Sequence, residues 1–137
     1  GKVFVGAFAL DYTKLLRADQ SIRESESRFR HMFDQNPEAL FIEDENGYIL
    51  EANIKAGEMQ RMPLEDLIGK NMLDFVPEHK REEVKKAHQD FFEGRILHQT
   101  TSAWNKDGKE ISVDLRASFI QQKGKKALLF SLSEREV

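Results

Sequence analysis

Apolar and polar positions alternate most clearly around one turn in the first half of the chain. Two short apolar runs, residues 40–42 and 48–50, flank the polar tetrad at residues 44–47, Asp-Glu-Asn-Gly. Because Asn and Gly tolerate the positive φ of a tight turn, this stretch predicts a β-hairpin. Asn53 then stands where a helix N-cap belongs, since its side-chain oxygen can accept a hydrogen bond from the first turn of a helix over residues 54–62.

A helical pattern precedes the hairpin, from about Thr13 to Phe33. Leu15, Ile22 and Phe29 recur at every seventh position, which is typical of one apolar seam on a helix. The helix is expected to end near Pro37, because the residue before a proline is driven out of the α region. Such a helix could pair with its copy in a dimer or lie across its own domain. Three heptads without a large apolar residue at every core position do not decide between the two.

Short helical segments follow the hairpin. Residues 63–68 and 72–76 each predict about one helical turn, the first of them stopped by Gly69. Residues 78–93 predict a longer helix, with Val84 and Phe91 on one apolar face. These segments are the available cover for a sheet.

The last third of the chain has the pattern of a β-meander. Three runs, about residues 98–105, 109–119 and 125–132, are separated by two glycine-containing turns. The middle run alternates strictly, which predicts one buried and one solvated face. The expected buried positions are Ile111, Val113, Leu115, Ala117 and Phe119. At the other end of the chain, residues 2–10 alternate weakly and are rich in Val, Phe and Ala, which predicts a further strand.

Composition narrows the range of functions. The chain of 137 residues is 39% hydrophobic and 33% charged, with a net charge of -3, which gives no basic field for nucleic acid. It has no cysteine, which excludes disulfides, thiol catalysis and cysteine-based zinc sites. No long apolar run or signal peptide is present, so we expect a cytoplasmic protein without direct membrane insertion.

The order of these elements, together with specific residues, resembles a PAS domain. The resemblance rests on the acidic-Asn-Gly hairpin, on Asn53 before the third element, on the stretch from Leu64 to Lys70, and on the turn after Trp104. It covers about residues 27–134. The resemblance implies an α+β fold: a five-stranded antiparallel sheet covered on one face by short helices and one longer helix, and preceded by an N-terminal linker helix.

The N-terminal segment resembles the end of another PAS domain. In that family the last strand runs into an Asp-x-Thr motif, here Asp11-Tyr12-Thr13, and then into a connecting helix. The implied organisation is a terminal strand and motif at residues 1–12, a connecting signalling helix at 13–34 and a PAS domain at 35–134. The parent protein is then expected to be a tandem-PAS signalling protein.

A ligand pocket is expected between the inner face of the sheet and the helices, as the resemblance implies. Alternation assigns its lining residues, although the assigned faces could be displaced by one position. The expected lining is Phe41, Met59, Leu73, Phe91, Ile111, Val113, Leu115 and Leu129. The same residues could instead make a filled core, because any domain of this size needs one.

The absence of certain residues excludes some cofactors. A LOV flavin adduct and the chromophore of photoactive yellow protein both need a cysteine, so both are excluded. Haem is disfavoured, because the proximal position of haem PAS domains falls on Val84, with His88 one turn later as the only substitute; His88 is expected to be a solvated helix residue. Non-covalent flavin or a small metabolite remains open.

The sequence shows no catalytic or metal site. The four histidines lack metal-ligand spacing, and no phosphate-binding glycine loop or nucleophile elbow is present. Glu43, Asp44, Glu45 and Glu51 are expected to be solvated charges around the hairpin turn.

The expected function is a sensory PAS/PAC module, itself not an enzyme. The expected parent is a two-component histidine kinase, with a diguanylate cyclase or a transcriptional regulator as other hosts. The expected partners are a second copy, through the N-terminal helix, and the neighbouring PAS and output domains. The alternative is a ligand-free PAS domain that dimerises and relays helix orientation.

Overall fold

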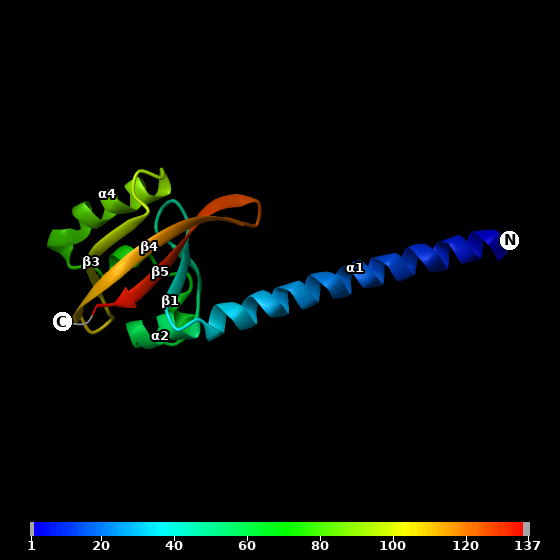
Figure 1. The fold of residues 1–137 in the computed structure, drawn as a ribbon, viewed down its shortest axis with the longest axis horizontal. Helices are drawn as coiled ribbons and strands as arrows, with labels where there is room; N and C mark the ends of the chain where they lie inside the picture. The colour runs from blue at the N-terminus through cyan, green and yellow to red at the C-terminus, as the bar shows by residue number, and fades with distance from the viewer. Residues whose placement is uncertain (1, 136–137) are drawn as a thin grey trace. The chain divides into compact units, whose positions relative to one another are not determined.

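The computed structural model describes residues 2–135, with side chains from Lys14 onward (Figure 1). Contacts divide the chain into two units, Gly1–Gln35 and Asn36–Val137.

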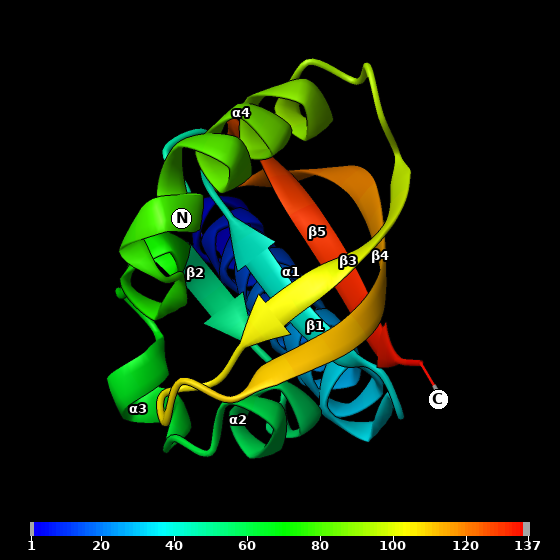
Figure 2. The ribbon, with the colours of Figure 1, turned by 90° about the vertical axis from the view of Figure 1, so that its left-hand side faces the viewer.

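The second unit is built on a five-stranded antiparallel sheet. Its strands are β1 (Ala39–Glu43), β2 (Ile49–Ala52), β3 (His98–Trp104), β4 (Glu110–Gln122) and β5 (Lys125–Glu134). Their order across the sheet is β2-β1-β5-β4-β3, so the first hairpin and the last three strands join through the β1–β5 pair (Figure 2). The predicted hairpin, the meander and the fold class are confirmed.

The helices between the two halves of the sheet also agree with the prediction. They are α2 (Ile54–Gln60), α3 (Leu64–Leu67), η1 (Met72–Phe75), η2 (Glu78–Lys80) and α4 (Arg81–Phe92). The predicted helix over residues 78–93 begins as a 3-10 turn and continues as α4. Side chains from α2, α3 and α4 join those of the sheet in one core: Ala56, Met59, Leu67 and Phe91 pack with Phe41, Val113, Leu128 and Phe130.

Asn53 ties the hairpin to α2 as a buried N-cap. Its Oδ1 accepts hydrogen bonds from the Leu40 and Ala56 amides, both at 2.9 Å, and its Nδ2 donates to the Glu38 carbonyl at 3.0 Å. The predicted cap is confirmed, and the same side chain also satisfies backbone groups of the first strand, which the sequence pattern did not indicate.

The alternation of β4 holds for only part of its length. Val113 and Ala117 are buried, whereas Phe119 is 47% exposed, so the prediction of a buried Phe119 is wrong. The last β4 residue paired with β3 is Arg116, and Phe119 lies beyond it on the extended β4–β5 hairpin. On this hairpin the Lys126 ammonium lies 4.3 Å from the centroid of the Phe119 ring, which is a cation–π contact.

The first unit is one helix, α1 (Lys2–Gln35). The helix predicted over residues 13–33 and its end before Pro37 are confirmed, but the strand predicted at residues 2–10 is wrong, because those residues are helical. A strand needs a partner for its backbone hydrogen bonds, whereas a helix satisfies them within the segment. Side chains of residues 2–13 lie outside the described part of the chain.

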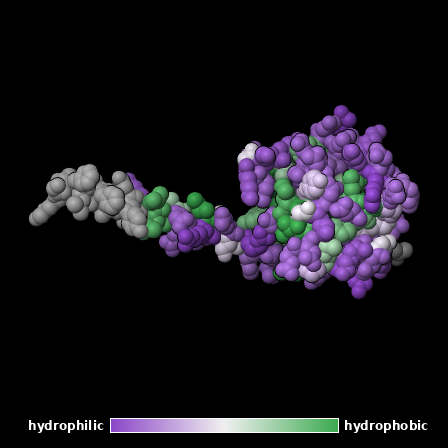
Figure 3. All heavy atoms as spheres, turned by 180° about the vertical axis from the view of Figure 1, so that it is seen from behind, coloured by the Kyte–Doolittle hydropathy of each residue, from purple (hydrophilic) through white to green (hydrophobic). Residues whose placement is uncertain are grey.

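Beyond that point α1 exposes apolar side chains, visible as green spheres on the helix in Figure 3. Leu15, Ile22 and Phe29 of the predicted seam are 68%, 59% and 46% exposed. Phe29 stacks on Phe33 of the same helix, with ring centroids 5.4 Å apart. The seam therefore leaves apolar surface on this helix available to a partner.

Candidate ligand-binding site

A cavity of about 140 Å³ lies within the second unit, between the sheet and its helical cover. Its wall is contributed by all five strands and by α2, η1 and α4, and most of it is apolar. The large apolar side chains that line it are Phe41, Ile49, Met72, Phe75, Val76, Val84, Phe91, Trp104, Val113, Leu115, Phe130 and Leu132. For comparison, a cavity of about 150 Å³ holds a molecule of benzene.

The structure brings half of the predicted lining residues to this cavity. Phe41, Phe91, Val113 and Leu115 line it. The other four do not: Met59 is buried in the adjoining core, Ile111 packs against that core, Leu73 is half-buried on η1, and Leu129 is half-buried on the other side of β5.

Leu129 shows how the face assignment slipped by one residue. Residues 127–130 of β5 are apolar without a break, so their sequence contains no alternation to read. Pairing with β1 sets the register: Phe41 lies opposite Phe130 and Ile42 lies opposite Leu129. Phe130 therefore shares the face of Phe41 and lines the cavity, and Leu129 belongs to the other face.

Glu43 is a buried cavity residue, which contradicts its interpretation as a solvated charge. It is 6% exposed, at the end of β1. Burial raises the pKa of its carboxyl from 4.5 to about 8, with a smaller contribution from the neighbouring Asp44 carboxylate. The period of two from Phe41 could have revealed this position, because residues 41 and 43 of a strand point to the same face.

His88 is also buried, at 5% exposure, so its interpretation as a solvated residue is wrong. Its Nε2 lies 2.9 Å from the carbonyl oxygen of Asp44, and because a carbonyl only accepts, Nε2 carries the hydrogen. Burial lowers the pKa of the imidazole more than the backbone carbonyl of Asp44 raises it. The sequence did contain a signal for this burial: His88 lies one helical turn from both Val84 and Phe91, so it shares the apolar face of the helix.

Glu43 and His88 face each other across the end of the cavity. The distance between Glu43 Oε1 and His88 Nδ1 is 3.7 Å, too long for a hydrogen bond. Both atoms are buried without a hydrogen-bond partner, as is Oε1 of Gln60, which also lines the cavity. Since burial disfavours the charged form of each group, we describe the pair as a neutral acid beside a neutral imidazole.

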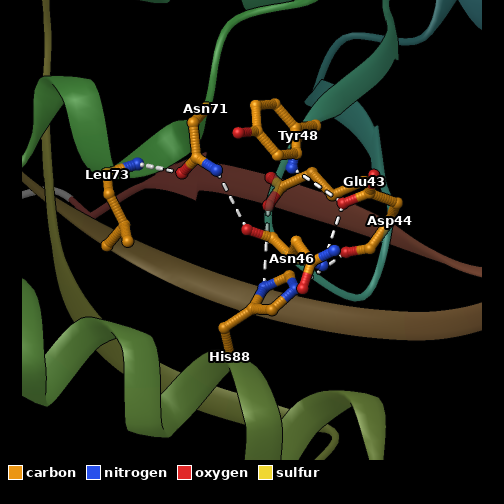
Figure 4. A network of polar contacts seen from close by, with 7 residues as sticks. All are labelled: Glu43, Asp44, Asn46, Tyr48, Asn71, Leu73 and His88. Carbon is orange, nitrogen blue, oxygen red and sulfur yellow. Dashed lines mark hydrogen bonds and ion pairs between the residues drawn. The ribbon is translucent and has the colours of Figure 1, made fainter.

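The turn between β1 and β2 is attached to two helical segments near this pair (Figure 4). Asp44 Oδ1 accepts hydrogen bonds from the amides of Asn46 and Tyr48, each at 2.9 Å. Asn71 donates to the Asn46 carbonyl at 3.0 Å and accepts from the amide of Leu73 in η1. Together with the hydrogen bond from His88 on α4, these contacts connect the turn to η1 and to α4, which both line the cavity.

The part of the chain that the structure describes contains neither a metal-binding cluster nor a membrane-spanning helix. No group of three or more His, Asp or Glu side chains is placed to hold a metal ion. Within residues 2–135, no helix combines the length and the apolar character needed to cross a membrane.

Comparison with known proteins identifies the class. The sequence model of the PAS fold matches residues 27–134, so the chain belongs to the PAS family. PAS domains are generally sensory, non-catalytic modules. No curated protein matches the chain.

Solved PAS domains have the same fold. The PAS domain of an HTR-like protein from Haloarcula marismortui is 18% identical, with a TM-score of 0.69, over 87% of this chain and 98% of that one. A PAS domain from a two-component sensor histidine kinase is 20% identical, with a TM-score of 0.63, over 82% and 99%. The PAS domain of the quorum-sensing receptor RpfR from Cronobacter turicensis, in complex with BDSF, is 17% identical, with a TM-score of 0.58, over 73% and 95%. At these identities the likeness concerns the fold alone.

Proposed function

We propose that this PAS domain is a cytoplasmic sensory module that binds a small molecule between its sheet and its helices. The cavity of about 140 Å³, lined by mostly apolar side chains, is the observation that carries the proposal. The RpfR PAS domain, which has the same fold, was solved with BDSF. We favour a small metabolite over haem or flavin, because a cavity of this volume suits a ligand about the size of benzene.

The signal would pass from the cavity to the flanking segments. His88 and Asn71 attach the β1–β2 turn to α4 and η1, so a ligand that moves α4 or η1 also acts on the first hairpin. A ligand shifts such a system only if it binds one arrangement better than the other. The parent we propose is a tandem-PAS sensor histidine kinase, in which residues 13–34 connect this domain to a preceding PAS domain.

The first test is native mass spectrometry of the full chain, together with a visible absorption spectrum. A retained ligand gives extra mass that is lost on denaturation, and absorbance separates a flavin or haem from a colourless metabolite. Ala103→Leu then reduces the cavity, because Ala103 lines it, whereas Ser118→Leu places a leucine side chain at an exposed position. We expect Ala103→Leu alone to lower ligand retention; equal retention in both variants would count against the cavity as the site.

The second candidate is a relay without a ligand, favoured by the exposed apolar seam of α1. Leu15, Ile22 and Phe29 are spaced as in a two-helix coiled coil and are all exposed. Ile22→Asp should dissociate a homodimer held there, because it places a charge in the apolar interface. Ser21→Asp, one position away on an exposed site, is the control. An unchanged solution mass of Ile22→Asp, measured by light scattering, would exclude dimerisation through this seam.

A further inference from the structure

The cavity contains three buried polar atoms that have no hydrogen-bond partner in the protein. They are Glu43 Oε1 at the end of β1, His88 Nδ1 on α4 and Gln60 Oε1 at the end of α2. All three residues are more than nine-tenths buried and all three line the cavity. A buried polar atom without a partner is costly, so such atoms in a native structure call for an explanation.

The other contacts of these side chains define what each free atom can do. His88 Nε2 uses its hydrogen on the carbonyl of Asp44, so Nδ1 presents a lone pair. Gln60 Nε2 donates to the Trp104 carbonyl at 3.2 Å, which leaves the amide oxygen as an acceptor. The Glu43 carboxyl, even when protonated, supplies one hydrogen and two oxygens. Among these three side chains, free acceptors therefore outnumber free donors.

The rest of the wall is mostly apolar, and its other polar side chains, Gln99, Thr101 and Ser102, lie on β3. The side chains nearest to the pair on the sheet and on α4 include Phe91 and Phe130, whose rings meet edge to face at 5.4 Å. His88 itself lies against Phe130, with ring centroids 5.8 Å apart. A head group placed at Glu43 and His88 is thus shielded from water, where a matched hydrogen bond discriminates most strongly.

We propose that the ligand of this cavity is a small molecule with an apolar body and a neutral head that donates hydrogen bonds, a hydroxyl or amino group, received by Glu43 and His88. The inference rests on the proposed ligand-binding function and adds the chemical class of the ligand. A carboxylate or another head that only accepts could use no more than the one hydrogen of Glu43 and would leave His88 Nδ1 and Gln60 Oε1 without a partner, so it binds more weakly. Gln60 supplies a further acceptor for a second donor on the ligand.

Four probes with the same number of non-hydrogen atoms test the proposal on the full chain. Phenol and aniline donate O–H or N–H hydrogen bonds, toluene neither donates nor accepts, and pyridine N-oxide only accepts. Their dissociation constants are measured by titration followed through the backbone amide signals in NMR. One net hydrogen bond contributes about 1 kcal/mol, so we expect phenol and aniline to bind about fivefold tighter than toluene and pyridine N-oxide.

Glu43→Met provides the matched variant, because methionine keeps the length of the side chain and removes its acceptors. We expect it to lower the affinity for phenol and aniline about fivefold and to leave toluene unchanged or tighter. Glu45→Met, on the exposed side of the same turn, makes the same side-chain replacement and should leave all four affinities unchanged. The amide spectrum of each variant shows whether the fold is kept.

The outcomes separate the two proposals. If toluene or pyridine N-oxide binds at least as tightly as phenol and aniline, the cavity is a ligand site but the donor-head proposal is wrong. The donor-head proposal also fails if Glu43→Met keeps the wild-type ratio of phenol to toluene affinity. If none of the four probes perturbs the amides of the cavity wall, both the proposed ligand site and its chemistry are overturned.

Discussion

Glu43→Gln should make the chain more stable, and the gain should grow with pH. The wild-type carboxyl is buried at the end of β1, where burial raises its pKa from 4.5 to about 8. The folded chain therefore keeps a proton that the unfolded chain releases. Glutamine has nearly the same shape and does not ionise, so it removes this linkage and leaves the packing around Phe41 and Phe130 in place.

The magnitude follows from the size of the shift. Stability contributed by the protonated Glu43 is fully present below the unfolded pKa of 4.5 and is lost as the pH rises through about 8. Each unit of pKa corresponds to about 1.4 kcal/mol, so the complete effect is about 5 kcal/mol. About 3 kcal/mol of it should be lost by pH 7, where the unfolded chain is ionised and the folded chain is still mostly protonated.

The assay is urea unfolding of the wild type and of Glu43→Gln at several pH values from about 4.5 to about 9. The difference in free energy of unfolding between the two is the measured quantity, because it cancels titrations that both chains share. His88 is one of these: burial lowers its pKa, so its contribution to stability is lost as the pH falls, the opposite direction. Glu45→Gln, at an exposed position of the same turn, is the control.

A difference that stays constant over this pH range would refute the reasoning, since a buried, protonated carboxyl requires it to grow with pH. A difference that shrinks with rising pH would instead indicate that Glu43 is ionised in the folded chain and paired with a protonated His88.

Four further substitutions test the fold by urea unfolding. Asn53→Ala should cost about 3 kcal/mol, because it leaves three backbone groups unpaired, the buried amides of Leu40 and Ala56 and the partly buried carbonyl of Glu38; a loss below about 1 kcal/mol would contradict this role. Gly47→Ala should cost about 1–2 kcal/mol, because φ is +86° and a Cβ would lie 3.2 Å from Met72 Cγ, and a neutral result would show that the turn relaxes freely. Phe91→Ala should cost about 4 kcal/mol and Phe119→Ala about 1 kcal/mol, in line with their exposures of 1% and 47%; equal losses would disprove the assigned burial.

Predictions based on neighbouring residues were confirmed because the physical cause is itself local. The polar tetrad before Tyr48 makes a hairpin turn wherever it lies, and Gly47 has the positive φ that such a turn demands. Asn53 caps α2 through an amide only three residues away. The strict alternation around Val113 requires a strand with one buried face. The fold class followed from these elements and from the family resemblance that their order carries.

The errors concern pairing between distant segments. A strand at residues 2–10 requires a partner that the described chain does not provide, and the segment forms part of α1 instead. The face of Leu129 depends on the register of β5 against β1, which an unbroken apolar run cannot specify. Phe119 is exposed because β4 continues beyond its pairing with β3.

The candidate site shows the same division. Sequence alone indicated the apolar wall, since Phe41, Phe91 and Val113 are apolar residues at the correct periods. It did not reveal the polar end of the cavity, because burial of Glu43 and His88 results from contact between the end of β1 and α4, which are distant in the sequence. An ionisable side chain favours solvent, whereas its place on an apolar face favours burial, and only the tertiary structure shows that Glu43 and His88 are buried.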